Sequence, residues 1–277
     1  MPEISDARFR AGEGEPLVLI HGFTATWRCW TPLLAELVPR FDVFAPTLSG
    51  HDGGPDHPAG VPMSMAGAAE LLERQLDEQG IETAHLVGNS LGGALAIELA
   101  RRGRARSVTA ISPGAGWTDP LEGERIVRFF RRTQRLARMS APRAHVLLRR
   151  PGSRRLAFRD VMLRGELVQP HEAVALVRSS VRCRVVDLVF DAIRQGTAML
   201  DHMGDVDAPV LVAWGRHDRI LPLERHAPRF RSELRGVDFR VLERCGHTPM
   251  WDDPPLLVRT ILDGVAAARP TAAPAPA

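Results

Sequence analysis

One hexapeptide, Gly88-Asn89-Ser90-Leu91-Gly92-Gly93, constrains the fold more than any other part of the chain. It fits the pattern G-x-S-x-G and follows the apolar run 84–87. A helical pattern begins directly after Ser90 and covers residues 91–102. In so tight a strand-to-helix turn, side chains at the two glycines of the pattern would collide with neighbouring backbone. The segment therefore predicts a turn that exposes Ser90 above a sheet as a nucleophile; the alternative is a plain glycine-rich turn with Ser90 as a helix cap.

Short apolar runs alternate with helical patterns along most of the chain, and this alternation indicates the fold class. The expected strands are residues 16–20, 41–45, 84–87, 107–112, 209–214 and 237–242. The expected helices are residues 30–38, 64–79, 91–102 and 253–268. Such alternation is typical of βαβ units. We therefore predict an α/β fold, in which helices flank a mostly parallel central sheet.

Residues 114–204 interrupt this rhythm because they show helical patterns and no clear strand. Residues 125–155 contain eleven Arg and no Asp or Glu. Apolar and small residues recur there at helical spacing, namely Ile126, Phe129, Phe130, Thr133, Ala137 and Met139. This pattern predicts a helix with an apolar face and an Arg face, the latter either solvated or able to steer anionic substrates. We expect a core formed by 1–113 and 205–268, a helical insertion over 114–204, and a disordered Ala/Pro-rich tail over 269–277.

A serine nucleophile needs a base, and the base needs an acid that orients it. His247 lies between the last expected strand and the last expected helix, which places it at the same sheet edge as Ser90. Asp218 closely follows the strand that ends at Trp214. The order Ser, Asp, His favours a catalytic triad, with Asp119 as the alternative acid. The alternative for His247 is a loop or helix-capping residue, and the alternative for Asp218 is a residue that makes a turn or capping hydrogen bond.

Two backbone N–H groups are placed to bind the negatively charged oxygen that such a nucleophile creates. Leu91 follows Ser90 at the start of a helix, and Phe23 follows the strand 16–20. Gly22 permits close approach of the backbone. We predict that Phe23 and Leu91 form an oxyanion hole, the alternative for Phe23 being an ordinary strand-to-loop turn.

Charge and cysteine content exclude several classes of protein. The chain has 36 basic residues, all of them Arg, against 33 acidic ones, so its net charge is only +3. This balance argues against nucleic acid as the main partner. The three cysteines lie far apart and show no metal-ligand spacing. No apolar run approaches the ~20 residues of a membrane span, and no secretory signal is visible, so we expect a cytoplasmic protein.

Five segments stand together in the order of one known family: His21-Gly22-Phe23, Ser49-Gly50-His51, Gly88 to Gly93, Gly215 to Asp218 and Gly246-His247. With them the chain resembles the α/β-hydrolase superfamily, in the branch with a helical cap after the sixth strand. Only sixteen residues precede Leu17, which leaves room for one antiparallel strand near 7–11 in place of the usual two. The resemblance therefore implies a sheet of about seven strands.

The resemblance also implies an activity: cleavage of a small carboxylic ester through an acyl-enzyme on Ser90, with no metal or organic cofactor. A serine argues against dehalogenation and epoxide opening, for which the family uses Asp. The main alternative is a carbon–carbon bond hydrolase for ring-cleavage diketones, because that group often has Gly-Asn-Ser-Met-Gly-Gly and a Trp four residues after the base, as Trp251 is here. The loop after His21 lacks the Gly-Pro-Gly type of stretch of that group, and this absence argues against the alternative. Lactone or thioester hydrolysis, a peroxidase side activity, and a ligand-binding protein without catalysis remain as further alternatives.

A small-molecule substrate is expected to bind between the sheet edge and the cap. Residues that flank the motifs are candidates for its pocket: Trp27, Leu48, Met250 and Trp251, together with the side chain of Phe23. The alternative for each is packing in the core.

Overall fold

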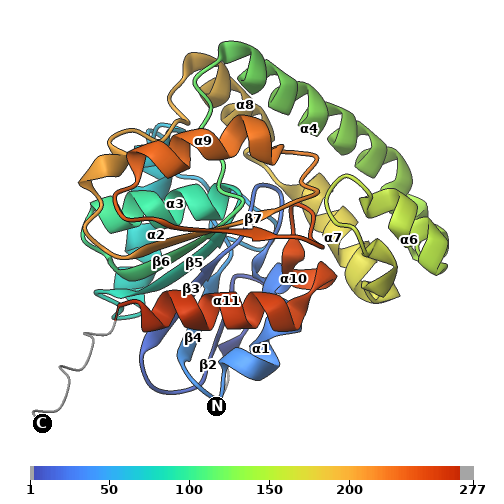
Figure 1. Ribbon diagram of the computed structural model, residues 1–277. Helices are drawn as coiled ribbons and strands as arrows, with labels where there is room; N and C mark the ends of the chain where they lie inside the picture. The colour runs from blue at the N-terminus through green and yellow to red at the C-terminus, as the bar shows by residue number, and fades with distance from the viewer. Residues whose placement is uncertain (1–2, 269–277) are drawn as a thin grey trace, which may run out of the picture.

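The structure is a computed structural model that describes residues 3–268. These residues form one eight-stranded sheet with the strand order β1-β2-β4-β3-β5-β6-β7-β8 (Figure 1). The strands are β1 (Glu3–Ile4), β2 (Arg8–Ala11), β3 (Pro16–Ile20), β4 (Asp42–Pro46), β5 (Ala84–Asn89), β6 (Ala105–Ile111), β7 (Val210–Gly215) and β8 (Asp238–Leu242). Neighbours from β4 to β8 pair in parallel, whereas β1 and β2 are antiparallel. The predicted α/β fold with a mostly parallel sheet is confirmed.

The N-terminal edge differs from the sequence-based expectation by one strand. Besides β2, which was expected, the two-residue β1 pairs with it through Ile4 and Phe9. A strand of two exposed residues has no alternation of apolar and polar residues, so the sequence pattern does not reveal it.

Helices cover both faces of the sheet and fill the connection between β6 and β7. Those of the sheet region are α1 (Thr31–Leu37), α2 (Met65–Glu78), α3 (Leu91–Arg101), α9 (Leu223–Glu233), α10 (Pro249–Asp252) and α11 (Pro254–Ala266), with the 3₁₀ turn η1 (Trp27–Trp30). Those between β6 and β7 are α4 (Pro120–Ser140), α5 (Ala144–Leu147), α6 (Pro151–Phe158), α7 (Pro170–Arg182) and α8 (Val186–Gln195), with 3₁₀ turns at Ala141–Arg143, Gly165–Leu167 and Met203–Asp205.

Two apolar cores form because successive residues of a strand point to opposite faces of the sheet. In β3, Val18 and Ile20 pack on the side of α2 and α3, and Leu17 and Leu19 pack on the side of α1 and α11. Both faces are therefore buried, as expected for a parallel sheet covered by helices. This leaves the carboxyl edge of the strands as the place where loops can gather functional groups.

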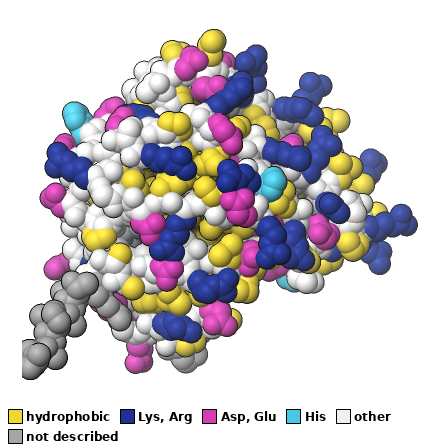
Figure 2. All heavy atoms as spheres, viewed as in Figure 1, with side chains coloured by type: hydrophobic (Ala, Val, Ile, Leu, Met, Phe, Trp, Pro, Cys, Tyr) yellow, Lys and Arg dark blue, Asp and Glu magenta, His cyan; other side chains and the backbone are white. Residues whose placement is uncertain are grey.

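The segment between β6 and β7, residues 114–204, lies at one end of the sheet (Figure 1). In α4, Ile126 and Val127 are buried, and the Arg side chains of α4 to α6 are mostly exposed (Figure 2). Met139 does not join the apolar face as expected, since 71% of it is exposed. The division into a core and a cap stays a prediction, and the expected tail 269–277 lies outside the described residues. Within residues 3–268 no helix is both long and apolar enough to span a bilayer.

Candidate active site

Ser90 occupies the turn between β5 and α3 in a backbone conformation that non-glycine residues rarely adopt. Its φ and ψ are 56° and −117°, a combination that stores strain. The turn depends on its glycines: a Cβ on Gly88 would lie 2.0 Å from the oxygen of Gly92, and a Cβ on Gly92 would lie 2.1 Å from that of Ile20. The sequence folds this way because only hydrogen fits at both positions.

His247 and Asp218 form a buried pair at the same edge of the sheet. His247 Nδ1 donates to Asp218 Oδ2 at 2.7 Å. Asp218 Oδ1 accepts the backbone N–H groups of Ile220 and Leu221 at 2.9 and 2.8 Å. Because the carboxylate holds the proton of His247 on Nδ1, Nε2 is left as the basic atom. The imidazole is thereby oriented and prepared to accept a proton.

Asn89 joins the serine turn to the histidine loop, a contact that the sequence analysis did not anticipate. Its Nδ2 donates to the backbone oxygen of His247 at 2.9 Å and to that of Ile111 at 3.2 Å. The Ser90 hydroxyl has no hydrogen-bond partner within residues 3–268. Serine–base contacts are often long before substrate binds. The only sign of this contact in the sequence is the position of an amide side chain immediately before Ser90.

Asp252 is a second residue that sequence reasoning missed. Its Oδ2 accepts the N–H of Gly246 at 2.7 Å, and its Oδ1 accepts the N–H of Arg164 at 2.8 Å. The carboxylate thus connects the loop of His247 with the segment between β6 and β7. Burial raises the pKa of Asp252. In the sequence, Asp252 could not be told from its neighbour Asp253, which caps α11 by accepting from Leu256 N–H at 3.1 Å.

Of the two predicted oxyanion donors, Phe23 lies on the loop after β3 and Leu91 is the first residue of α3. A Cβ on Gly22 would be 3.2 Å from Ser90 Cβ, so the loop after β3 packs against Ser90. The N–H groups of Phe23 and Leu91 have no protein acceptor within residues 3–268. Both donors are therefore available to a ligand.

A buried histidine fixes the loop that carries Phe23. His21 Nε2 accepts the N–H of Leu48 at 2.9 Å, and its Nδ1 donates to the oxygen of Gly22 at 2.8 Å. Burial lowers the pKa of His21 well below its usual value. A neutral ring can accept at one nitrogen and donate at the other, which this arrangement requires.

Asp119, the alternative acid, is exposed and caps α4 by accepting the N–H of Leu121 at 2.9 Å. His247 has its hydrogen bond to Asp218 instead. No group of three or more His, Cys, Asp or Glu residues in the described part of the chain could hold a metal ion.

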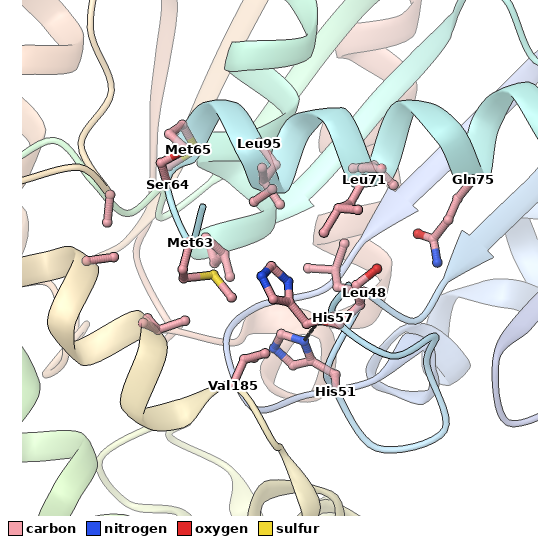
Figure 3. A pocket seen from close by; sticks show the side chains of 17 residues that line it. Leu48, His51, His57, Met63, Ser64, Met65, Leu71, Gln75, Leu95 and Val185 are labelled. Atoms are coloured by element: carbon pink, nitrogen blue, oxygen red, sulfur yellow. Dashed lines mark hydrogen bonds between the residues drawn. The ribbon is translucent and has the colours of Figure 1, made fainter. Parts of the chain in front are cut away.

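An apolar cavity adjoins this site between the sheet region and the segment that leads into α8. Leu48 lines this cavity (Figure 3), and so does Leu91. That the cavity binds substrate stays a prediction. Trp27, Met250 and Trp251 do not line it, contrary to expectation, because they pack in the core on the side of α1 and α11. Phe23 is also absent from its walls; its ring contacts the rings of Phe130 and Phe190, with centroids 5.0 and 6.2 Å apart.

The sheet and its helical layers are those of the α/β-hydrolase fold. Residues 17–260 match the model of the alpha/beta hydrolase family, and the chain belongs to this family. Over 201 residues it is 39% identical to the epoxide hydrolase EphH of Mycobacterium tuberculosis, covering 69% of this chain and 90% of the relative. Over 270 residues it is 26% identical to a 2-hydroxy-6-oxo-6-phenylhexa-2,4-dienoate hydrolase of Burkholderia cepacia, covering 92% and 89%.

Solved structures share the fold. A thermophilic esterase from Thermogutta terrifontis superposes with a TM-score of 0.71 at 22% identity, over 95% of this chain and 94% of the esterase. A 2-hydroxy-6-oxo-6-phenylhexa-2,4-dienoate hydrolase from Rhodococcus sp. superposes with a TM-score of 0.73 at 23% identity, over 96% and 100%. At these identities the likeness concerns the fold and not the reaction.

Proposed function

We propose that this protein is a serine hydrolase that cleaves small carboxylic esters through an acyl-enzyme. The observation that carries the proposal is the 2.7 Å hydrogen bond between His247 and Asp218 at the edge where Ser90 is presented. An imidazole oriented in this way can activate a hydroxyl that is otherwise a weak nucleophile. The segment 114–204 would act as a cap that limits access of water and shapes the substrate site.

In the first half of the reaction, Ser90 Oγ attacks the ester carbonyl while its proton passes to Nε2 of His247. The N–H groups of Phe23 and Leu91 donate to the resulting oxyanion, and each contact contributes about 3 kcal/mol to transition-state stabilisation. Collapse of the tetrahedral intermediate breaks the ester C–O bond, and His247 returns its proton to the departing alcohol. In the second half, water replaces Ser90 by the same route and releases the acid.

The identity of the nucleophile argues against epoxide opening in this chain, although the relative from Mycobacterium tuberculosis is named an epoxide hydrolase. A carboxylate that opens an epoxide forms an ester, whose carbonyl water can then attack. Attack by Ser90 would form an ether, which offers water no carbonyl. We therefore expect no turnover of epoxides through a covalent intermediate on Ser90.

Carbon–carbon bond hydrolysis is the second candidate. It is favoured by the similarity over 92% of this chain to the Burkholderia cepacia enzyme, and a serine, a base and an oxyanion hole also suit that reaction. Trp251 adds no support, because it is only 8% exposed and packs in the core. Lactones and thioesters would be cleaved by the ester mechanism and differ only in the leaving group.

A substrate panel tests these assignments. It contains aryl esters of increasing acyl length, a lactone, a thioester, an epoxide and a ring-cleavage diketone, each with wild type and Ser90→Ala. We expect Ser90-dependent turnover to be fastest with the aryl esters. Faster turnover of the diketone would replace the ester proposal by the second candidate.

A fluorophosphonate probe separates a hydrolase from a ligand-binding protein on the same fold. The expected result is labelling of wild type and none of Ser90→Ala. Absence of labelling on folded wild type would favour the binding protein.

A further inference from the structure

The cavity beside the candidate active site is shared by the sheet region and the segment between β6 and β7. α2 and α3 form one side, and residues at the start of α8 form the other (Figure 3). Its cavity volume is about 60 Å³. Most of the wall is aliphatic or thioether, as with Leu71, Met63 and Val185. Such a wall favours an apolar ligand group.

The cavity lies next to the reacting centre through Leu91. The backbone N–H of this residue is one of the two proposed oxyanion donors, and its side chain lines the cavity. Ser49 and His51 also line the cavity, and Gly50 between them is tied to the segment 114–204, because Gly50 O accepts the N–H of Arg184 at 2.8 Å. The cavity and the proposed oxyanion hole thus share one residue, Leu91.

Three residues of the cavity lining each carry a polar atom that is buried without a hydrogen-bond partner. These atoms are Nε2 of His51, Nδ1 of His57 and Oε1 of Gln75, and all three residues line the cavity (Figure 3). Buried polar groups are normally paired with protein, water or ligand. Three of them around one cavity indicate that its proper content is polar at some points.

Each of the two imidazoles presents a lone pair when its ring is neutral. Nδ1 of His51 is 3.3 Å from the oxygen of Ser49, and Nε2 of His57 is 2.9 Å from the oxygen of Val61. A carbonyl oxygen only accepts, so each of these nitrogens carries the proton, and a neutral ring keeps its other nitrogen as an acceptor. Burial lowers the pKa of His51 to about 4, which keeps this ring neutral near pH 7.

Gln75 is oriented in the same sense. Its Nε2 donates to the backbone oxygen of Thr47 at 3.1 Å, which leaves Oε1 as the free atom. The amide cannot turn over without placing two oxygens against each other. Oε1 of Gln75 and Nε2 of the neutral His51 are therefore hydrogen-bond acceptors, as is Nδ1 of His57 when its ring is neutral, and a ligand that satisfies them must supply donors.

We propose that the cavity binds an apolar part of the substrate that carries hydroxyl or N–H donors, so that the preferred esters have a hydroxylated acyl group. This inference rests on the proposed ester hydrolysis for its link to Ser90. The apolar walls take up the carbon chain, and the acceptors of His51, His57 and Gln75 bind its donors. Purely aliphatic acyl chains leave these acceptors unpaired and are poorer substrates.

The test compares 4-nitrophenyl 6-hydroxyhexanoate with 4-nitrophenyl hexanoate. We expect wild type to favour the hydroxylated ester by about fivefold in kcat/KM, the usual effect of one neutral hydrogen bond. Because a hydroxyl donates only one hydrogen bond, we expect one of the variants His57→Phe and Gln75→Met to abolish this preference and the other to keep it. His171→Phe is the matched control, because His171 is exposed on α7 and lies outside the cavity. It should keep the wild-type preference.

A binding experiment on Ser90→Ala distinguishes failure of this inference from failure of the proposed function. The probes are N-butyl 6-hydroxyhexanamide and N-butyl hexanamide, titrated by calorimetry. If wild type hydrolyses both esters without preferring the hydroxylated one, the cavity proposal is overturned and ester hydrolysis stands. If wild type hydrolyses neither ester but Ser90→Ala binds the hydroxylated amide more tightly, the cavity proposal stands and ester hydrolysis is overturned. Equal binding of the two amides contradicts the cavity proposal in either case.

Discussion

The imidazole of His247 and the carboxylate of Asp218 are joined by a 2.7 Å hydrogen bond, although 29 positions separate them in the chain. Both side chains are buried, and the second oxygen of Asp218 is held by two backbone N–H groups. The pair therefore has one orientation available to it. The orientation of the pair decides where Nε2 of His247 lies. In the proposed mechanism this nitrogen accepts the proton of Ser90.

Asp218→Asn should lower kcat for an aryl ester by about 10³ to 10⁴-fold, because an amide can donate to Nδ1 and stabilise the wrong tautomer of His247. Asp119→Asn is the matched control, since the Asp119 carboxylate caps α4 and should leave kcat within about twofold of wild type. Steady-state kinetics measure both. A large loss in Asp119→Asn with little change in Asp218→Asn would reverse the assignment of the acid.

Ser90→Gly should be more stable than Ser90→Ala by about 1 kcal/mol, because glycine adopts the backbone conformation at φ 56° and ψ −117° without strain. Urea unfolding of the two inactive variants measures the difference. Equal stability would mean that the turn at Ser90 stores no appreciable strain.

Gly92→Ala should lower the free energy of unfolding by about 3 kcal/mol, since the added Cβ would lie 2.1 Å from the backbone oxygen of Ile20. Gly152→Ala is the control, because a Cβ there meets nothing within 4 Å. It should change stability by less than about 1 kcal/mol. Similar unfolding midpoints for the two variants would contradict the steric explanation of the G-x-S-x-G pattern.

Stability should fall in mild acid because His51 is buried in its neutral form. Burial lowers the pKa of His51 from 6.5 to about 4, so between these values the unfolded chain binds the proton and the folded chain does not. The stabilisation is present above pH 6.5 and is lost as the pH falls toward 4, by about 2 kcal/mol between pH 7 and pH 5. His51→Asn should show a smaller loss over this interval in urea titrations, and an identical pH dependence would exclude His51 as its source.

Asp252→Ala should lower kcat about tenfold by releasing Gly246 and displacing the neighbouring His247, with Asp252→Asn intermediate because it keeps one acceptor oxygen. Asp253→Ala is the control: it removes the cap of α11 and should lower stability by about 1 kcal/mol without changing kcat. Kinetics and urea unfolding on the same preparations separate positioning from stability. Loss of kcat in proportion to loss of stability in both variants would leave Asp252 with a structural role alone.

The fold class and the positions of the candidate nucleophile, base and acid can be predicted from local patterns of residues. The glycines around Ser90 and the strands before Ser90 and Asp218 are local features, and the carboxyl ends of parallel strands necessarily meet at one edge. Such features depend on neighbours in the chain, so they can be recognised without knowing what packs against them.

The residues that surround the candidate site became known only from the folded chain. Trp27, Met250 and Trp251 are apolar residues near motifs, and their type is the same whether they line a cavity or fill the core. The contacts of Asn89 with His247 and of Asp252 with Arg164 join segments 158 and 88 positions apart. The atoms of His51, His57 and Gln75 that stay without a partner depend on which N–H groups of these side chains donate to backbone oxygens in the folded chain. These are properties of packing and hydrogen-bond geometry, and no local pattern encodes them.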